Sequence, residues 1–262
     1  MSAAREVLMP TSEAEAVELF GDGVHVTVIG GGTIVVPSVA AGRLAPPRTM
    51  FLGKAGLDGI SRNGATVTIG ATTSVASLVD LAAPIGPCAE NVADPEVRAQ
   101  ATLGGNLCVS GTSEVPRGDL QGALLALDAQ VRSDGAGGER SESLEHFLGA
   151  RDGRLLLSVS YDEPAAGAFE YIRYPHTHTY TVLAVSAVRA QDGAIRLAAT
   201  GLAGGPSRLR AAERVADDPE AAGAAALSEV ELADDALASA WYRTKTLPVL
   251  VRRALTTLKE SA

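Results

Sequence analysis

Thr102-Leu103-Gly104-Gly105-Asn106 is a short stretch in which two adjacent glycines leave the backbone bare. A bare backbone adopts positive φ angles and approaches a ligand closely, and successive main-chain N–H groups can cradle a phosphate. A second stretch of this kind, Ile29-Gly30-Gly31-Gly32-Thr33, lies upstream. Each stretch alone is also explained by a tight turn in a β-rich domain, but the pair predicts a pyrophosphate held between two loops.

The first glycine stretch lies between two predicted elements. Val24-His25-Val26-Thr27-Val28-Ile29 is rich in β-branched residues and predicts a buried strand, and Ile34-Val35-Val36-Pro37 opens a new element. A strand followed by a glycine loop and a further element is the setting in which such loops bind phosphate. The G-x-G-x-x-G spacing of dinucleotide-binding folds and the Gly-Lys-Ser/Thr ending of P-loops are both absent.

The composition excludes several classes of function. The 262 residues are 46% hydrophobic but only 4% aromatic, so Ala, Val and Leu must build most of the core. A net charge of −9 argues against binding to nucleic acid or to an anionic membrane surface. Cys88 and Cys108 are too few to hold an iron–sulfur cluster or a structural zinc. Without a recognisable signal peptide or membrane span, a cytoplasmic location is expected.

The N-terminal part predicts short strands and helices in alternation. Thr11 or Ser12 caps one predicted helix, and Thr72-Thr73-Ser74 caps another. Strands are expected at residues 49–52, 66–70 and 130–132, and Asn63-Gly64 predicts a turn before the second of them. A strand-like segment is expected at residues 106–109, and a helix or buried segment at residues 119–129.

The C-terminal part begins at a boundary expected near Asp162-Glu163-Pro164. An antiparallel meander is predicted at residues 169–173, 181–188 and 195–200, and three helices at residues 219–227, 234–244 and 247–258. Strands first and helices last make this part α+β.

Side chains that could carry catalysis on their own form no recognisable set. The four histidines are scattered, and His176 with His178 is better explained by an exposed loop than by a metal site. No Gly-x-Ser-x-Gly elbow occurs, and the acidic pairs lie beside Ala-rich helical stretches. A bound cofactor would therefore have to carry the chemistry.

Four motifs and a tail follow one another in a characteristic order. The motifs are Val28-Ile29-Gly30-Gly31-Gly32-Thr33, Thr68-Ile69-Gly70-Ala71-Thr72-Thr73, Val92-Ala93-Asp94-Pro95-Glu96-Val97-Arg98 and Ala101-Thr102-Leu103-Gly104-Gly105-Asn106, and the tail is Ala238-Ser239-Ala240-Trp241-Tyr242-Arg243. In order and spacing they resemble the FAD-binding medium subunit of the molybdenum hydroxylases, the family of carbon monoxide dehydrogenase and xanthine dehydrogenase. The resemblance extends over nearly the whole chain.

The resemblance implies an α+β fold in two domains. Residues 1–160 would form the two-subdomain FAD-binding domain of the vanillyl-alcohol oxidase and xanthine dehydrogenase type, with subdomains of about 1–53 and 54–160. Residues 161–262 would form the small C-terminal domain of antiparallel sheet and helices.

The resemblance also implies a cofactor site without catalytic or metal-binding residues. Backbone N–H groups of both glycine stretches would hold the FAD pyrophosphate, Asp119 would bind a ribose hydroxyl, and Leu155 or Leu156 would pack on the adenine or the flavin. Arg173 would lie close to the flavin, and Gly111-Thr112-Ser113-Glu114 is an expected insertion before Asp119. The implied cofactor-binding residues are Ile29, Gly30, Gly31, Gly32, Thr33, Ile34, Thr72, Val92, Ala93, Ala101, Thr102, Gly104, Gly105, Asn106, Asp119, Leu155, Leu156 and Arg173.

The function implied by the resemblance is electron transfer. Electrons would pass from a large subunit with the molybdenum cofactor, through the [2Fe–2S] clusters of a small subunit, to FAD and then to an external acceptor such as NAD⁺, oxygen or a quinone. A stand-alone flavin-dependent oxidoreductase on the same scaffold and a flavin-free homologue are the two alternatives. Neither nucleic acid nor insertion into a membrane is expected.

Overall fold

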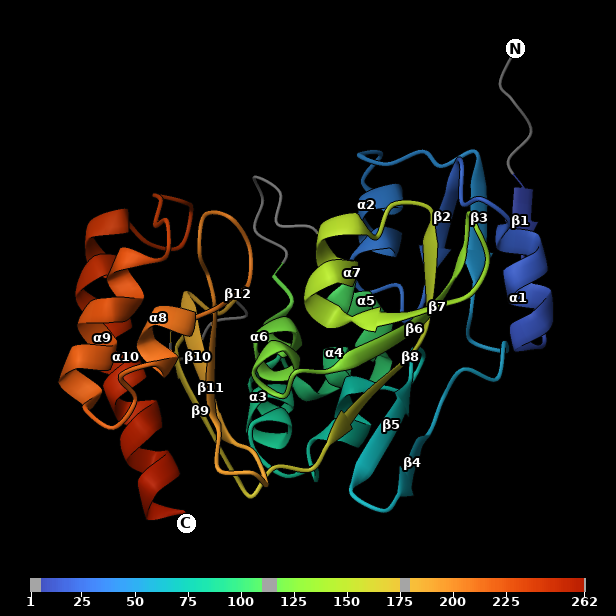
Figure 1. Cartoon of the computed structure of the whole chain (residues 1–262). Coiled ribbons are helices and arrows are strands. Elements are labelled where there is room, and N and C mark those ends of the chain that lie inside the picture. The colour runs from blue at the N-terminus through green and yellow to red at the C-terminus, as the bar shows by residue number, and fades with distance from the viewer. Residues whose placement is uncertain (1–5, 110–116, 175–179, 262) are drawn as a thin grey trace. The chain divides into compact units, whose positions relative to one another are not determined.

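The computed structural model describes residues 6–109, 117–174 and 180–261 (Figure 1). The chain divides into two compact units, and each unit is discontinuous in sequence. Unit 1 comprises the residues up to Ser77, Pro95–Cys108 and Gln130–Tyr161, and unit 2 comprises Leu78–Asp94, Val109–Ala129 and the residues from Asp162 onward. The domain limits implied by the resemblance, with a division at residue 160, stay a prediction.

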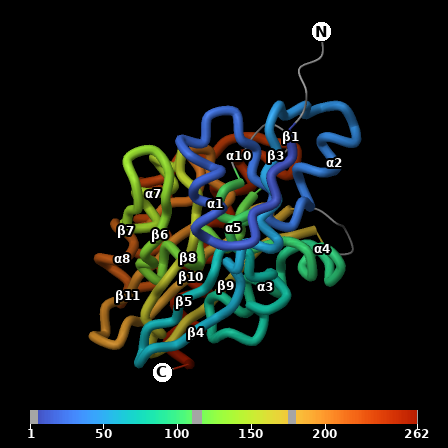
Figure 2. The backbone as a smooth tube through the Cα atoms, turned by 90° about the vertical axis from the view of Figure 1, so that its right-hand side faces the viewer, coloured from blue at the N-terminus to red at the C-terminus, as the bar shows by residue number. Residues whose placement is uncertain are grey.

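A small parallel sheet forms the N-terminal part of unit 1. β1 (Glu6–Leu8), β3 (Arg48–Phe51) and β2 (Val26–Ile29) lie in the order β1-β3-β2, and both pairs are parallel (Figure 1). Figure 2 shows β1 and β3 side by side. α1 (Glu13–Phe20) connects β1 to β2, and α2 (Val35–Ala40) connects β2 to β3. The Ser12 hydroxyl accepts a hydrogen bond from the Glu15 N–H, so one of the two predicted caps of α1 is confirmed.

A sheet of five strands forms the rest of unit 1, in the order β4-β5-β8-β6-β7. The strands are β4 (Ile60–Asn63), β5 (Thr66–Gly70), β8 (Arg154–Asp162), β6 (Gln130–Gly135) and β7 (Arg140–Ser143). The predicted turn at Asn63-Gly64 joins β4 to β5 in an antiparallel hairpin, with Gly64 at a φ of 61°. α4 (Pro95–Gln100) precedes the second glycine stretch, and α7 (Leu144–Ala150) follows β7.

The second glycine stretch is the first turn of a helix. The strand-like segment expected at residues 106–109 is wrong, because α5 spans Leu103–Leu107. Thr102 caps this helix, and its hydroxyl accepts a hydrogen bond from the Gly105 N–H at 3.1 Å. Leu103 and Leu107, four residues apart, are both fully buried, which is the spacing of one helix face. The helix expected after residues 72–74 is also wrong in extent, since only a 3₁₀ turn, η1 (Val75–Leu78), forms there.

Unit 2 is built on an antiparallel sheet with the order β12-β11-β10-β9, which confirms the predicted meander. Its strands are β9 (Ala166–Ile172), β10 (Leu183–Arg189), β11 (Ile195–Thr200) and β12 (Ser207–Arg208). α6 (Asp119–Ala126) packs on β10 and β11 and contacts α3 (Ile85–Asn91), while α10 (Ala240–Glu260) packs on β9 and β10 (Figure 1). Because helices cover both faces, every residue of β10 except the last is buried.

The C-terminal helices differ in one respect from the prediction. α8 (Arg210–Glu213) and α9 (Pro219–Ser228) precede a single long helix, α10. Residues 247–258 are helical as predicted, but they continue without a break from residues 240–244, and residues 234–239 are not helical. Residues 234–239 form a turn, and α10 continues through Pro248. Within the described part of the chain, no helix has the length and apolar character needed to cross a membrane.

Candidate functional site

The two glycine stretches meet in unit 1 beside a cavity of about 300 Å³. Six of the predicted cofactor-binding residues line it: Gly30, Thr72, Thr102, Gly104, Gly105 and Leu156. Eleven further residues complete the lining: Phe20, Gly23, Val26, Val28, Leu52, Ala71, Cys108, Arg151, Asp152, Gly153 and Arg154. Segments far apart in sequence therefore converge on one cavity, and its lining includes both glycine backbone and apolar side chains.

Close backbone approach explains why glycine is required where the stretches meet. A Cβ atom on Gly30 would collide with the Thr102 hydroxyl, and one on Gly31 would collide with the Gln100 carbonyl oxygen. A Cβ atom on Gly104 would lie 2.9 Å from the Ala71 carbonyl oxygen. The interpretation of two unrelated tight turns does not account for this mutual contact, because an isolated turn needs glycine only for its φ angle.

The hydrogen bonds distinguish the two stretches. Among the described residues, the backbone N–H groups of residues 30–34 donate to no other group. The N–H groups of Leu103, Gly104 and Asn106 donate to backbone carbonyls, and that of Gly105 donates to the Thr102 hydroxyl. The prediction that amides of both stretches bind phosphate stays a prediction. In this structure the first stretch presents unused donors, and the second supplies close packing and the Thr102 side chain.

The other predicted residues of unit 1 do not belong to the lining of this cavity. Leu155 is buried in the core with Leu157, so Leu156 is the member of the predicted pair that lines the cavity. Ile29 is buried in the core, and Asn106 lies in α5. The Ala101 carbonyl accepts a hydrogen bond from the Val75 N–H. The remaining predicted residues, Gly31, Gly32, Thr33 and Ile34, belong to the first glycine stretch and the residue after it.

Arg154 is a cavity residue that sequence reasoning missed. Its guanidinium donates to the carbonyls of Ser133, Ala136 and Gly138 at 2.7, 3.0 and 2.8 Å, and it is only 7% exposed. It thereby fixes the turn between β6 and β7. An arginine opening the apolar run of β8 was the available signal, since a buried arginine needs several acceptors.

Four predicted residues lie in unit 2: Val92, Ala93, Asp119 and Arg173. Arg173 is hydrogen-bonded to the turn that contains Val92 and Ala93. Its guanidinium donates to the carbonyls of Asn91 and Ala93 at 2.5 and 2.9 Å, and Val92 lies between these two residues. Ala93 has a φ of 45°, an uncommon backbone conformation for a residue with a Cβ atom. Arg173 thus holds a strained turn in place, which is typical of segments that shape a ligand wall.

Asp119, the fourth of these residues, is joined to the same turn through Thr181. The Asn91 amide donates to the Thr181 hydroxyl at 2.8 Å, and that hydroxyl donates to Asp119 Oδ2 at 2.7 Å. Burial raises the pKa of Asp119 to about 6, while the Thr181 hydrogen bond and the charges of Arg117 and Arg173 oppose the shift.

The second oxygen of Asp119 has no hydrogen-bond partner within the described part of the chain, although it is buried. A buried acceptor without a donor is costly, so this oxygen is suited to accept a hydrogen bond from a ligand hydroxyl or N–H.

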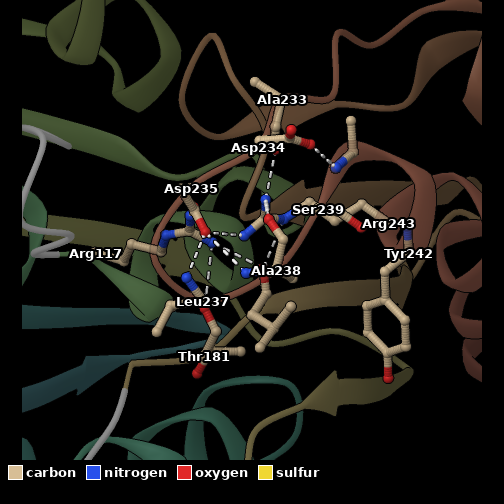
Figure 3. A network of polar contacts seen from close by, with 12 residues as sticks. Arg117, Thr181, Ala233, Asp234, Asp235, Leu237, Ala238, Ser239, Tyr242 and Arg243 are labelled. Atoms are coloured by element: carbon tan, nitrogen blue, oxygen red, sulfur yellow. Dashed lines mark hydrogen bonds and ion pairs between the residues drawn. The ribbon is translucent and has the colours of Figure 1, made fainter.

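A network of arginines around Asp235 supports this arrangement (Figure 3). Arg117 donates to the Val182 carbonyl at 2.7 Å and pairs with Asp235, and Arg243 donates to Asp235 at 2.7 Å. Arg243 is only 1% exposed and also donates to the carbonyls of Ala233 and Ala238. Sequence reasoning missed this network, because its members are far apart in the chain.

Two further expectations concern side chains outside the site. His176 with His178 and the segment Gly111–Glu114 lie outside the described residues. Across the part that is described, no group of three or more His, Cys, Asp and Glu side chains could hold a metal ion.

Comparison with known proteins agrees with the geometry. Residues 3–160 match the family model of the FAD binding domain in molybdopterin dehydrogenase. The chain is 28% identical to the carbon monoxide dehydrogenase medium chain of Afipia carboxidovorans, covering 97% of this chain and 96% of that one. It is 27% identical to the nicotine 6-hydroxylase medium subunit of Paenarthrobacter nicotinovorans, covering 94% of each.

A solved structure gives the same result for the fold. Reconstituted CO dehydrogenase from Oligotropha carboxidovorans superposes with a TM-score of 0.87 at 26% identity, over 100% of both chains. This likeness confirms the α+β architecture with an FAD-binding domain. The family match covers more than half of the chain, and the site offers unused amide donors beside a cavity with an apolar side. The chain therefore belongs to the family of FAD-binding domains of molybdopterin dehydrogenases, and FAD is its cofactor.

Proposed function

We propose that this chain is the electron-transfer subunit of a molybdenum hydroxylase. It would receive electrons from the [2Fe–2S] clusters of a small subunit and pass them through FAD to an external acceptor. Relatives that match along at least 94% of their length are named medium chain or medium subunit, which supports a role beside other subunits. They carry different substrates in their names, carbon monoxide and nicotine, so we assign substrate choice to the large molybdenum subunit rather than to this chain.

The observation that carries the proposal is the set of unused amides at residues 30–34, in contact with the second glycine stretch. These amides would hold the FAD pyrophosphate, with the Thr102 hydroxyl nearby. FAD supplies the one- and two-electron chemistry when it is bound, so the protein has to bind and orient it.

The remaining site residues have assigned tasks under this proposal. Leu156 and the apolar lining contributed by Phe20 and Val26 would pack on a flat ring of the cofactor. Asp119 would accept a hydrogen bond from a cofactor hydroxyl through its unpartnered oxygen, and the Val92–Ala93 turn held by Arg173 would form a wall.

The test is to purify the full chain alone and measure its flavin content, its own substrate turnover and its reduction by partner subunits. We expect stoichiometric FAD, no turnover by the chain alone, and bleaching of the flavin when reduced small subunit is added. Turnover without partners would favour the stand-alone oxidoreductase, and a colourless protein that takes up no added FAD would favour the flavin-free homologue.

A further inference from the structure

Thr181 joins two helices of unit 2 through its hydroxyl, although no cofactor contact is assigned to it. It lies shortly before β10 and is only 1% exposed. The hydroxyl lies 2.8 Å from the amide nitrogen of Asn91, the last residue of α3, and 2.7 Å from Oδ2 of Asp119, the first residue of α6. Among the described residues, the other Asp119 oxygen, Oδ1, is buried without a hydrogen-bond partner. Thr181 therefore contacts one carboxylate oxygen and leaves the other open.

The direction of these two hydrogen bonds follows from counting protons. A threonine hydroxyl has a single proton to donate. Because the Asn91 amide donates to the Thr181 oxygen, the proton of Thr181 is left for Asp119 Oδ2. If the amide were turned over, its oxygen would take that proton, and the Thr181 oxygen would face the carboxylate with no proton between them. The donors therefore run in one direction, from Asn91 through Thr181 to Asp119.

The backbone around Thr181 is held by hydrogen bonds from other parts of unit 2. The Val182 N–H donates to the Ile172 carbonyl at 2.8 Å. Arg117 donates to the Val182 carbonyl at 2.7 Å and to the Thr181 carbonyl at 3.3 Å, and Figure 3 shows Arg117 and Thr181 in one polar network. A hydroxyl on a fixed backbone loses little further conformational freedom when it forms its hydrogen bonds. Its position is thus set before any ligand arrives.

We propose that Thr181 is a positioning residue for the cofactor: it holds the Asp119 carboxylate so that Oδ1 is the oxygen left to accept a hydrogen bond from a hydroxyl or N–H of FAD. The proposal rests on the proposed function, which assigns Asp119 to the cofactor. Thr181 acts through Asp119 and has no ligand contact of its own. The ligand group has to be a donor, because an oxygen without a proton would be repelled by the carboxylate.

The ionisation of Asp119 depends on Thr181 and on neighbouring groups from four parts of unit 2. These groups are Arg117 before α6, Arg173 after β9, Cys88 in α3 and Tyr180 before β10. Burial is the largest effect and raises the pKa of Asp119, whereas the Thr181 hydrogen bond and the charges of the two arginines lower it. The thiol and the phenol stay neutral near pH 7, because burial and the Asp119 charge raise the pKa of each. Without the Thr181 hydroxyl, Asp119 is therefore expected to take up a proton at higher pH.

The experiment compares two substitutions that separate the hydroxyl of Thr181 from its methyl group. Thr181→Val keeps the shape of the side chain and removes the hydroxyl, and Thr181→Ser keeps the hydroxyl and removes the methyl group. FAD is added to the flavin-free full chain between about pH 5 and about pH 9, and binding is followed by the change in flavin fluorescence. Near pH 8, Thr181→Val should weaken binding at least about 10-fold, and Thr181→Ser should stay within about 3-fold of the wild type.

The pH dependence of binding distinguishes positioning from packing. Wild-type affinity should fall as the pH drops below about 6, because a protonated Asp119 no longer offers a charged acceptor. Thr181→Val should move this fall to higher pH by about one pH unit, and Thr181→Ser should leave it in place. A carbon NMR titration of isotope-labelled aspartate in the flavin-free chain follows the same proton directly, and Asp119→Asn identifies the signal.

The outcomes separate this role of Thr181 from the proposed function. If the wild type binds FAD and Thr181→Val matches it in affinity and pH dependence, Thr181 has no positioning role and the proposed function stands. Equal losses in Thr181→Val and Thr181→Ser would assign the effect to packing of the methyl group and would also overturn the role. A wild-type chain that takes up no FAD at any pH would overturn the proposed function and this role together.

Circular dichroism and thermal unfolding of each flavin-free variant establish that it is folded. If Thr181→Val does not fold, Thr181→Ala takes its place, because alanine differs from the serine of Thr181→Ser by the hydroxyl alone. Weaker FAD binding and a fall at higher pH in Thr181→Ala than in Thr181→Ser are then the expected result, and no difference between the two would overturn the role.

Discussion

The buried carboxyl of Asp119 should make the stability of the apoprotein depend on pH. Asp119 is 6% exposed, and burial raises its pKa from the usual 3.8 to about 6. The folded protein therefore binds this proton more tightly than the unfolded chain does. Stability contributed by the protonated carboxyl is fully present below pH 3.8 and is lost as the pH rises to about 6. At about 1.4 kcal/mol per pH unit, the loss amounts to about 3 kcal/mol.

Asp119→Asn removes this dependence, because an amide does not ionise and its oxygen can still accept the Thr181 hydrogen bond. We expect the variant to unfold with about the same free energy as the wild type at the acid end of the window and to be more stable by about 3 kcal/mol above pH 7. The same variant should bind FAD more weakly than the wild type. Removing a buried charge that serves ligand binding commonly raises the stability of the protein at the cost of its function.

The assay is urea unfolding of the flavin-free full chain at half-unit steps of pH, followed by circular dichroism. The quantity of interest is the difference in unfolding free energy between Asp119→Asn and the wild type. Asp217→Asn, at an exposed carboxyl, is the control and should show a small, flat difference. If the difference in unfolding free energy between Asp119→Asn and the wild type also stays constant with pH, the buried Asp119 carboxylate does not destabilise the folded protein, and the reasoning is refuted.

Three further substitutions test other parts of the structure. Gly31→Val should abolish FAD binding, measured as flavin per polypeptide, because the new side chain would collide with the Gln100 carbonyl oxygen. Gly149→Ala is the control: open space surrounds this position, so the flavin content should stay unchanged. Thr102→Ala should destabilise the protein by about 1 kcal/mol in chemical unfolding through loss of the α5 cap, and Thr102→Ser should restore most of it. Arg243→Met should cost about 3 kcal/mol or more in the same assay, because it removes one of the two arginines that pair with Asp235 and the side-chain donor of the Ala233 and Ala238 carbonyls; a loss below about 1 kcal/mol would contradict that role.

Local sequence signals predicted much of the fold. Thr11 or Ser12 before an apolar-periodic run was the predicted cap of α1, and the Asn63-Gly64 dipeptide predicted the turn that joins β4 to β5. The run at residues 181–188 predicted a strand, and the structure places β10 there with both faces covered by helices. These features depend on neighbours in the sequence, so reasoning from spacing and residue type was sufficient.

The errors arose where tertiary contacts override local preference. Two glycines obscured α5, whose formation depends on the Thr102 cap and on burial of Leu103 and Leu107. Two helices were expected at residues 234–244 and 247–258, but packing against β9 and β10 maintains one continuous helix, α10, with Pro248 inside it. The turn at residues 234–239 depends on Asp235, which is held by arginines from distant parts of the chain and could not be predicted locally.

The residue types of the candidate site could be predicted from the sequence, but the separate roles of its residues could not. The pairing of the glycine stretches followed from their composition, and the family resemblance supplied Asp119 and Arg173. The unused amides of the first stretch and the position of Arg154 in the cavity lining depend on hydrogen bonds between distant segments. Spacing in a single sequence carries no information about those bonds.

The central claim is that this chain carries electrons through bound FAD, and stopped-flow mixing with the reduced [2Fe–2S] small subunit tests it most directly. The account predicts that the flavin absorbance of the purified chain bleaches after mixing, in the absence of any substrate, and recovers when an acceptor is added. A flavin that stays oxidised after mixing, in a chain that oxidises a substrate by itself, would contradict it.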